Sequence, residues 1–185
     1  MVVQQVPAMS VIVISPDSYS TVRKTIRRLR AQGASHQLEI VLVVPSAQAA
    51  NIDHTELDSF CGIHIVEIGD MTSTARARAA GVRRAIAPVV AFVEDHSFPA
   101  KGWAEALIQA HRKPWAAVGP MMANANPNSL VSWTNLIIEY AEWMEPVSAG
   151  VREHLPGHNG TYKRDVLLEY GDRLEAMLEA ESILQ

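Results

Sequence analysis

The sequence lacks features typical of secreted or membrane-spanning proteins, namely paired cysteines, long apolar runs and a basic N-terminal start. Its single cysteine, Cys61, cannot form an internal disulfide framework and favours a reducing compartment. No apolar run reaches the roughly 18 residues of a membrane-spanning helix, and residues 1–5 lack the basic start of a secretory signal. These absences predict a cytoplasmic protein. Peripheral membrane association stays open, because an enzyme can act on lipid-bound substrates without a span of its own.

Positive charge and phosphate-binding signatures are also scarce. Lysine and arginine together number 16 against 20 aspartates and glutamates, so the formal net charge is −4. This balance argues against a nucleic-acid partner. The sequence contains no Gly-x-Gly-x-x-Gly and no P-loop pattern. The usual dinucleotide-binding and triphosphate-hydrolysing classes therefore lose support.

Short β-branched runs alternate with longer helical stretches along the chain. We expect strands at residues 10–14, 39–44, 63–67, 89–93, 115–120 and 158–162. We expect helices at about residues 19–31, 75–86, 102–112 and 129–145, with one or two more in 164–185. This alternation is typical of βαβ units, and no repeat or long linker divides the chain. The sequence predicts a single α/β domain over residues 1–185, with a mainly parallel central sheet flanked by helices.

The most apolar strand, residues 89–93, leads directly into Glu94, Asp95 and His96. Ligands of an open parallel sheet bind at the carboxyl ends of its strands. Adjacent carboxylates repel each other when both are ionised, and a divalent cation relieves that repulsion. A metal site and a solvated acidic turn are about equally compatible with these residue types.

Other polar side chains occur in loops and at helix ends. Position alone favours a solvated role for an arginine at a helix start and for acidic residues on a terminal helix. These candidates are Ser15 and Asp17 after the first strand, Arg78 in the helix at 75–86, His158 and Asn159 beside a Pro-Gly turn, and Glu175, Glu179 and Glu181 near the C-terminus.

The order of these motifs resembles that of the family-2 glycosyltransferases, which have the GT-A type nucleotide-sugar-binding fold. The resemblance runs from about Ser10 to Leu184. It is carried by the strands at residues 10–14 and 39–44, Leu29-Arg30-Ala31-Gln32, Arg78-Ala79-Ala80-Gly81, Phe92-Val93-Glu94-Asp95-His96 at the place of the family's Asp-x-Asp motif, Pro99 with Trp103, residues 157–164, and the acidic segment at 179–184.

The resemblance implies inverting transfer of a sugar from a nucleotide-diphosphate donor to a hydroxyl of a saccharide, lipid or protein acceptor. A divalent metal, Mn²⁺ or Mg²⁺, would bridge the diphosphate and the protein through Glu94 and His96. Glu181 would be the general base. The residues expected to bind substrates are Ser15, Asp17, Arg78, Glu94, Asp95, His158 and Asn159.

Three departures from the family pattern keep alternatives open. Val44-Pro45-Ser46 stands where the family usually has an aspartate, and His96 replaces the last aspartate of the metal motif, which suits Mn²⁺ better than Mg²⁺. The chain also stops shortly after Glu181, without the family's common C-terminal extension. A noncatalytic nucleotide-sugar-binding or interaction protein is the main alternative, and a nucleotidyltransferase is a weaker one. Apolar side chains in the helix at residues 129–145 also leave homo-oligomerisation open.

Overall fold

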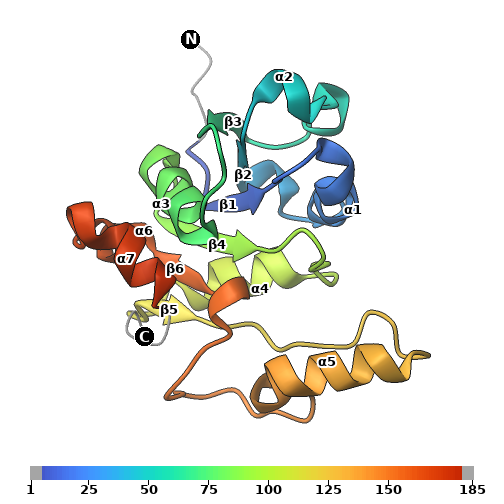
Figure 1. Cartoon of the computed structure of the whole chain (residues 1–185). Helices are drawn as coiled ribbons and strands as arrows, with labels where there is room; N and C mark the ends of the chain where they lie inside the picture. Colours follow the sequence, from blue (N-terminus) through green and yellow to red (C-terminus); the bar gives the residue numbers. More distant parts are fainter. Residues whose placement is uncertain (1–5, 181–185) are drawn as a thin grey trace.

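A central sheet organises the protein. The structure is a computed structural model, and it describes residues 6–180. The strands are β1 Met9–Ile14, β2 Leu38–Val44, β3 Gly62–Glu67, β4 Val89–Val93, β5 Ala117–Val118 and β6 Thr161–Lys163. Within the described range they form one sheet in the order β3-β2-β1-β4-β6-β5 (Figure 1). The strands β3, β2, β1 and β4 are parallel to one another, whereas β6 is antiparallel to both β4 and β5. The predicted α/β class with a mainly parallel sheet is confirmed.

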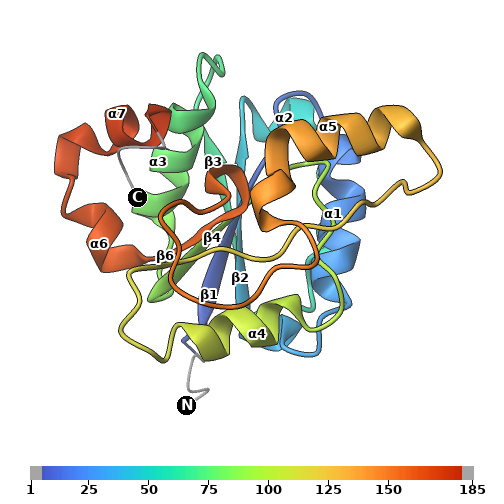
Figure 2. The same ribbon diagram turned by 90° about the horizontal axis from the view of Figure 1, so that it is seen from below.

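Helices cover both faces of this sheet. The α-helices are α1 Tyr19–Arg30, α2 Ala47–Ala50, α3 Thr74–Arg84, α4 Trp103–Ala110, α5 Leu130–Tyr140, α6 Arg164–Leu168 and α7 Leu174–Glu179. Short 3₁₀ turns are η1 Ser35–Gln37, η2 His54–Glu56, η3 Ala141–Trp143, η4 Gly157–Asn159 and η5 Gly171–Arg173. Figure 2 shows α3, α6 and α7 on one side of the sheet and α1 on the other. The core side chains place α4 on the α1 side.

The alternation of side chains along the strands supplies both halves of the core. On β1, Met9, Val11 and Val13 pack with the apolar face of α1, whereas Ile12 packs with α3, α6 and α7. Parallel strands covered on both faces need such continuous apolar runs. Gly81 lets α3 lie close to β1, because a Cβ atom at this position would be 2.7 Å from Ile12 Cγ2. The predicted glycine motif therefore has a packing role here.

The structure corrects several predicted elements. The expected strand at residues 158–162 is wrong in its first half, since His158 and Asn159 belong to the 3₁₀ turn η4 and the strand begins at Thr161. The strand predicted at 115–120 contains only two strand residues. The helix predicted at 129–145 ends as an α-helix at Tyr140 and continues as the 3₁₀ turn η3. Ser73 caps α3, and its hydroxyl accepts from the Arg76 N–H.

The helix α5 lies apart from the sheet (Figure 1). None of its residues is buried. Leu130, Val131 and Ile138 are among its most exposed apolar side chains. Over residues 6–180, no helix has both the length and the apolar character to cross a membrane.

Candidate active site

A small cavity lies at the point where the strand order of the sheet reverses. The chain passes from β1 outward to β2 and β3, and then returns through α3 to β4 on the other side of β1. Ligands of open α/β sheets bind outside the carboxyl ends of the strands at such a point. The cavity has a volume of about 220 Å³. It is lined by the ends of β1 and β4, Pro16, Thr74 and Arg78 of α3, and Asp95 and His158.

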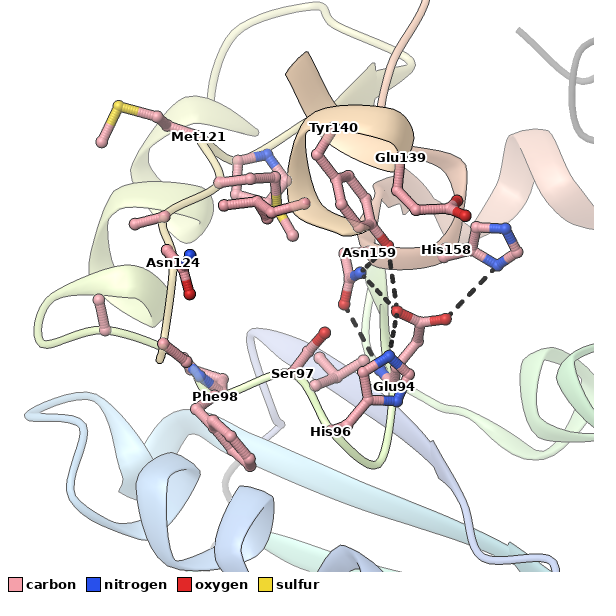
Figure 3. Close-up of a pocket in the computed structure, with 18 of the residues that line it drawn as sticks. Glu94, His96, Ser97, Phe98, Met121, Asn124, Glu139, Tyr140, His158 and Asn159 are labelled. Atoms are coloured by element: carbon pink, nitrogen blue, oxygen red, sulfur yellow. Dashed lines mark hydrogen bonds and ion pairs between the residues drawn. The ribbon is translucent and has the colours of Figure 1, made fainter. Parts of the chain in front are cut away.

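A larger cavity of about 730 Å³ lies on the α5 side of the same strand end. Its walls come from the loop between β4 and α4, the segment 120–126, one side of α5 and the turn η4 (Figure 3). Glu94 and His158 line both cavities. These two side chains therefore stand at the boundary between two neighbouring compartments.

Hydrogen bonds fix the carboxylate of Glu94 at this boundary. Its Oε2 accepts from the Tyr140 hydroxyl and from Asn159 Nδ2, each at 3.1 Å. The Tyr140 oxygen also accepts from Asn159 Nδ2, at 3.2 Å. His158 Nδ1 lies 3.7 Å from the other oxygen, Oε1 (Figure 3). Burial raises the pKa of the Tyr140 hydroxyl, and the negative charge of Glu94 adds to this, so Tyr140 remains a donor at neutral pH.

Arg78 extends the network to α3. It is only 4% exposed, with its guanidinium 5.3 Å from the centre of the Phe92 ring and its Nη2 3.1 Å from His158 Nδ1. The expectation that position leaves this arginine solvated is wrong. Its side chain is instead held between the sheet and η4, at the edge of the smaller cavity.

His96 is the most accessible member of the acidic strand end, with a side chain 75% exposed. Its Nδ1 lies 2.8 Å from Asp95 Oδ1 and its Nε2 lies 3.6 Å from Glu94 Oε2. The hydrogen bond to Asp95 raises the pKa of the His96 imidazole, and the nearby carboxylate charges act in the same direction. Glu94, Asp95 and His96 therefore form a compact group rather than three separate solvated side chains.

The distances between the donor atoms of this group decide whether it could hold a divalent cation. Two ligands of one ion, each about 2.1 Å from it, lie at most about 4.2 Å apart. The 3.6 Å between Glu94 Oε2 and His96 Nε2 meets that limit, and the carboxylate and imidazole donors suit Mn²⁺. Across residues 6–180, no group of three or more His, Cys, Asp or Glu side chains is arranged to hold a metal ion. The protein thus offers a partial ligand set, and a bound diphosphate would have to complete it.

Comparison with known proteins identifies the family. The model for glycosyl transferase family 2 matches residues 10–171. The chain belongs to glycosyl transferase family 2. No curated protein matches it.

Solved glycosyltransferase structures share the fold of this family-2 chain at low sequence identity. S. aureus TarS 1–349 in complex with UDP is 15% identical, with a TM-score of 0.69 over 95% of this chain and 52% of that one. The mannosyltransferase PcManGT from Pyrobaculum calidifontis, in complex with GDP-Man and Mn²⁺, is 18% identical, with a TM-score of 0.60 over 90% of this chain and 47% of that one. The chain spans about half the length of these proteins. They confirm the GT-A type fold.

Several other candidate residues line neither cavity, and one lies outside the described part of the chain. Ser15 is buried and donates to Ser18 O at 2.7 Å, while Asp17 is exposed, and neither lines a cavity. Only Pro16 of that loop reaches the smaller cavity. Glu175 and Glu179 are exposed on α7 and line neither cavity. The predicted base, Glu181, lies outside the described residues.

The structure adds Tyr140 to the predicted family-2 site. Its hydroxyl reaches Glu94 from 46 positions along the chain. No local pattern signals a contact between two residues so far apart in the sequence. The predicted group of Glu94, Asp95, His96, His158 and Asn159 is brought together.

Proposed function

We propose that the chain transfers a sugar from a nucleotide-diphosphate donor to an acceptor hydroxyl, with inversion at the anomeric carbon. The observation that supports this is the pair of cavities that meet at Glu94 and His158. The smaller cavity lies at the reversal point of the sheet, where nucleotides bind in α/β folds. The larger cavity offers a separate place for the acceptor. Transfer needs two molecules held side by side, and this arrangement suits that need.

The donor side depends on Arg78, Asp95 and the start of α3. The buried guanidinium of Arg78 can offset negative charge on a diphosphate, and the first N–H groups of α3 add positive potential. When bound, a divalent cation, Mn²⁺ or Mg²⁺, would stabilise the charge of the departing nucleotide diphosphate, and Glu94 and His96 would hold it. Asn159 and Tyr140 keep the Glu94 carboxylate oriented for that role.

Glu181 is the proposed general base, a role that the family resemblance implies. A carboxylate base would take the proton of the acceptor hydroxyl as it attacks the anomeric carbon. Replacing Glu181 with glutamine is expected to abolish transfer while leaving donor affinity unchanged. Parallel measurements of product formation and donor binding check this, and full turnover by the variant would place the base elsewhere.

The test of the function is a donor panel with the whole chain. UDP-GlcNAc and GDP-mannose are suitable first donors, because structural neighbours are complexes with UDP-GlcNAc and GDP-Man. A bound donor is expected to raise the melting temperature by mass action, more strongly with Mn²⁺. Transfer or hydrolysis of a labelled donor supports the enzyme. Binding across the panel without either reaction would instead support a noncatalytic nucleotide-sugar-binding protein.

A matched pair of variants sharpens this test. Arg78→Met removes the buried guanidinium at the smaller cavity and is expected to weaken donor binding about tenfold or more. Arg83→Met makes the same change on the exposed side of the same helix and is expected to leave donor binding unchanged. Equal effects of the two substitutions would remove the smaller cavity from the proposed donor site.

A further inference from the structure

The residues that line the larger cavity indicate which kind of acceptor it can bind, and membership of the family does not specify this. We infer that it binds an uncharged hydroxyl compound with an apolar or aromatic body, and that it discriminates against acceptors carrying a carboxylate or phosphate. This inference rests on the proposed function, because it assigns the larger cavity to the acceptor. Three properties of the cavity wall support it: its charge, its polar groups and its apolar surface.

The charge on the wall is acidic. Glu94 and Glu139 line the cavity, and the described residues lining it include no lysine or arginine. Lys24 lies near, 3.7 Å from the centre of the Phe98 ring, but it is not part of the wall. The two nitrogens of His96 already face the carboxylates of Asp95 and Glu94. The other imidazole of the wall, His158, also lies beside a carboxylate, with its Nδ1 3.7 Å from Glu94 Oε1. An anionic acceptor would therefore lose water beside two carboxylates and would find no lysine or arginine on the wall.

The polar groups on the wall are mostly amides and hydroxyls. Asn124 Oδ1 accepts from Asn126 N–H and from the Ser132 hydroxyl, each at 2.8 Å. Its Nδ2 is buried and has no hydrogen-bond partner among the described residues. A buried donor without a partner is costly, and an oxygen of a bound molecule can satisfy it. Amides and hydroxyls both donate and accept, so they match sugar or alcohol hydroxyl groups.

The rest of the wall is apolar and aromatic. Apolar and aromatic residues make up much of the remaining lining, namely Phe98, Trp103, Met121, Met122 and Leu136. Aromatic rings and flexible methionines provide adaptable contact with a ring or an alkyl chain. An apolar body with neutral hydroxyl groups is the acceptor that satisfies all three properties of the wall.

A pair of glycosides that differ in one group tests the inference. 4-Nitrophenyl β-D-glucopyranoside and 4-nitrophenyl β-D-glucuronide have the same aryl group and sugar ring, but the second carries a carboxylate. Calorimetric titration of the whole chain is expected to show at least about tenfold tighter binding of the neutral glycoside, an estimate for one uncompensated charge near a carboxylate. Equal or tighter binding of the glucuronide would overturn the inference, and so would binding of neither compound.

Two charge-reversal variants make the result specific to the cavity. Glu139→Lys places a cation on the wall and is expected to reduce the preference for the neutral glycoside severalfold. Glu142→Lys makes the same charge change at an exposed position of η3 that does not line the cavity, and it should leave the preference unchanged. Equal shifts in both variants would overturn the inference, because they would show that net charge rather than the wall sets the preference.

The donor assay separates this inference from the proposed function. If UDP-GlcNAc and GDP-mannose bind and turn over while the glucuronide is preferred, the function stands and the acceptor inference fails. If neither donor binds while the neutral glycoside is preferred and the Glu139 variant responds, the chemistry of the cavity stands and the proposed transfer fails.

Discussion

Two glutamate–histidine groups lie at opposite edges of the same sheet, and their surroundings differ. At the amino edge, Glu39 is fully buried, with its Oε1 2.7 Å from His64 Nε2. The Ser10 hydroxyl and Ile86 N–H donate to its Oε2, and Arg84 contacts the His64 ring. At the carboxyl edge, the Glu94 side chain is 22% exposed and adjoins two cavities.

Residue type alone does not mark a site. Both groups combine a carboxylate, an imidazole and an arginine, and α3 contributes both arginines, Arg84 at its C-terminal end and Arg78 about one and a half turns earlier along the helix. At the amino edge the protein itself supplies the partners, and neither Glu39 nor His64 lines either of the two cavities described above. The first group therefore stabilises the fold, whereas the second is available to a ligand.

The largest expected effect is on stability at the amino edge. Glu39→Ala leaves the buried Ser10 hydroxyl and Ile86 N–H without an acceptor and is expected to lower the free energy of unfolding by about 3–4 kcal/mol. Urea unfolding measures this. Glu175→Ala, on the exposed surface of α7, is the control and should change stability by less than about 0.5 kcal/mol. Similar losses in both variants would contradict the comparison.

The next effect is on activity at the carboxyl edge. Glu94→Gln keeps an oxygen that can accept from Tyr140 but removes the negative charge, so kcat/KM for transfer is expected to fall about 100-fold, or about 2.7 kcal/mol. Stability should change by less than about 1 kcal/mol, since the side chain is partly exposed. Steady-state kinetics and urea unfolding on the same preparation check both statements. A variant that is fully active but unstable would contradict the prediction, because it would give Glu94 the structural role assigned to Glu39.

A third prediction compares the buried His111 with the exposed His96. Burial, helped by the charge of Lys163, lowers the pKa of His111 to about 4. Its Nε2 pairs with Thr161 Oγ1 at 2.8 Å, and its buried Nδ1 has no partner among the described residues, so a second proton would be unpaired. His96, in contrast, has a raised pKa. NMR titration should show the two imidazoles shifted in opposite directions from 6.5.

The His111 shift has a consequence for stability. Between pH 6.5 and pH 4 the unfolded chain binds a proton at this position that the folded chain does not bind, so stability falls as the pH falls through that window. The loss is expected to reach about 2 kcal/mol by about pH 4.5, measured by urea unfolding. His111→Gln should flatten this part of the profile. An unchanged slope in the variant would assign the pH dependence to other groups.

The smallest effect concerns Tyr140. Tyr140→Phe removes a hydrogen bond to Glu94 but leaves the ring, and the expected loss in kcat/KM is about fivefold to tenfold, or about 1 kcal/mol. Because Asn159 still donates to the same oxygen, the effect should be smaller than that of Glu94→Gln. A loss as large as that of the Glu94 variant would show that Tyr140 contacts the reacting molecules directly.

The core of the fold could be predicted because its pattern is local. The strand at residues 89–93 matches β4 in both bounds, and the strand at 39–44 differs from β2 by one residue, since continuous apolar runs mark doubly covered strands. The short strands β5 and β6 have two and three residues, too few to show a period. Their antiparallel pairing depends on contacts between distant segments rather than on local pattern.

The site, like the fold, could be predicted only where it follows a local pattern. Glu94, Asp95 and His96 could be found because they directly follow a recognisable strand. The burial of Arg78 and the contact of Tyr140 with Glu94 could not, because each depends on a partner that is 80 or 46 residues away. Ser15 and Asp17 also follow a strand, but neither of them lines either cavity.

The boundary formed by Glu94 and His158 has a thermodynamic consequence. Since both side chains face both compartments, a molecule on one side alters the charge and hydrogen bonding met by a molecule on the other. Binding free energies linked in this way are reciprocal. The factor by which a donor changes the affinity for an acceptor must therefore equal the factor by which that acceptor changes the affinity for the donor.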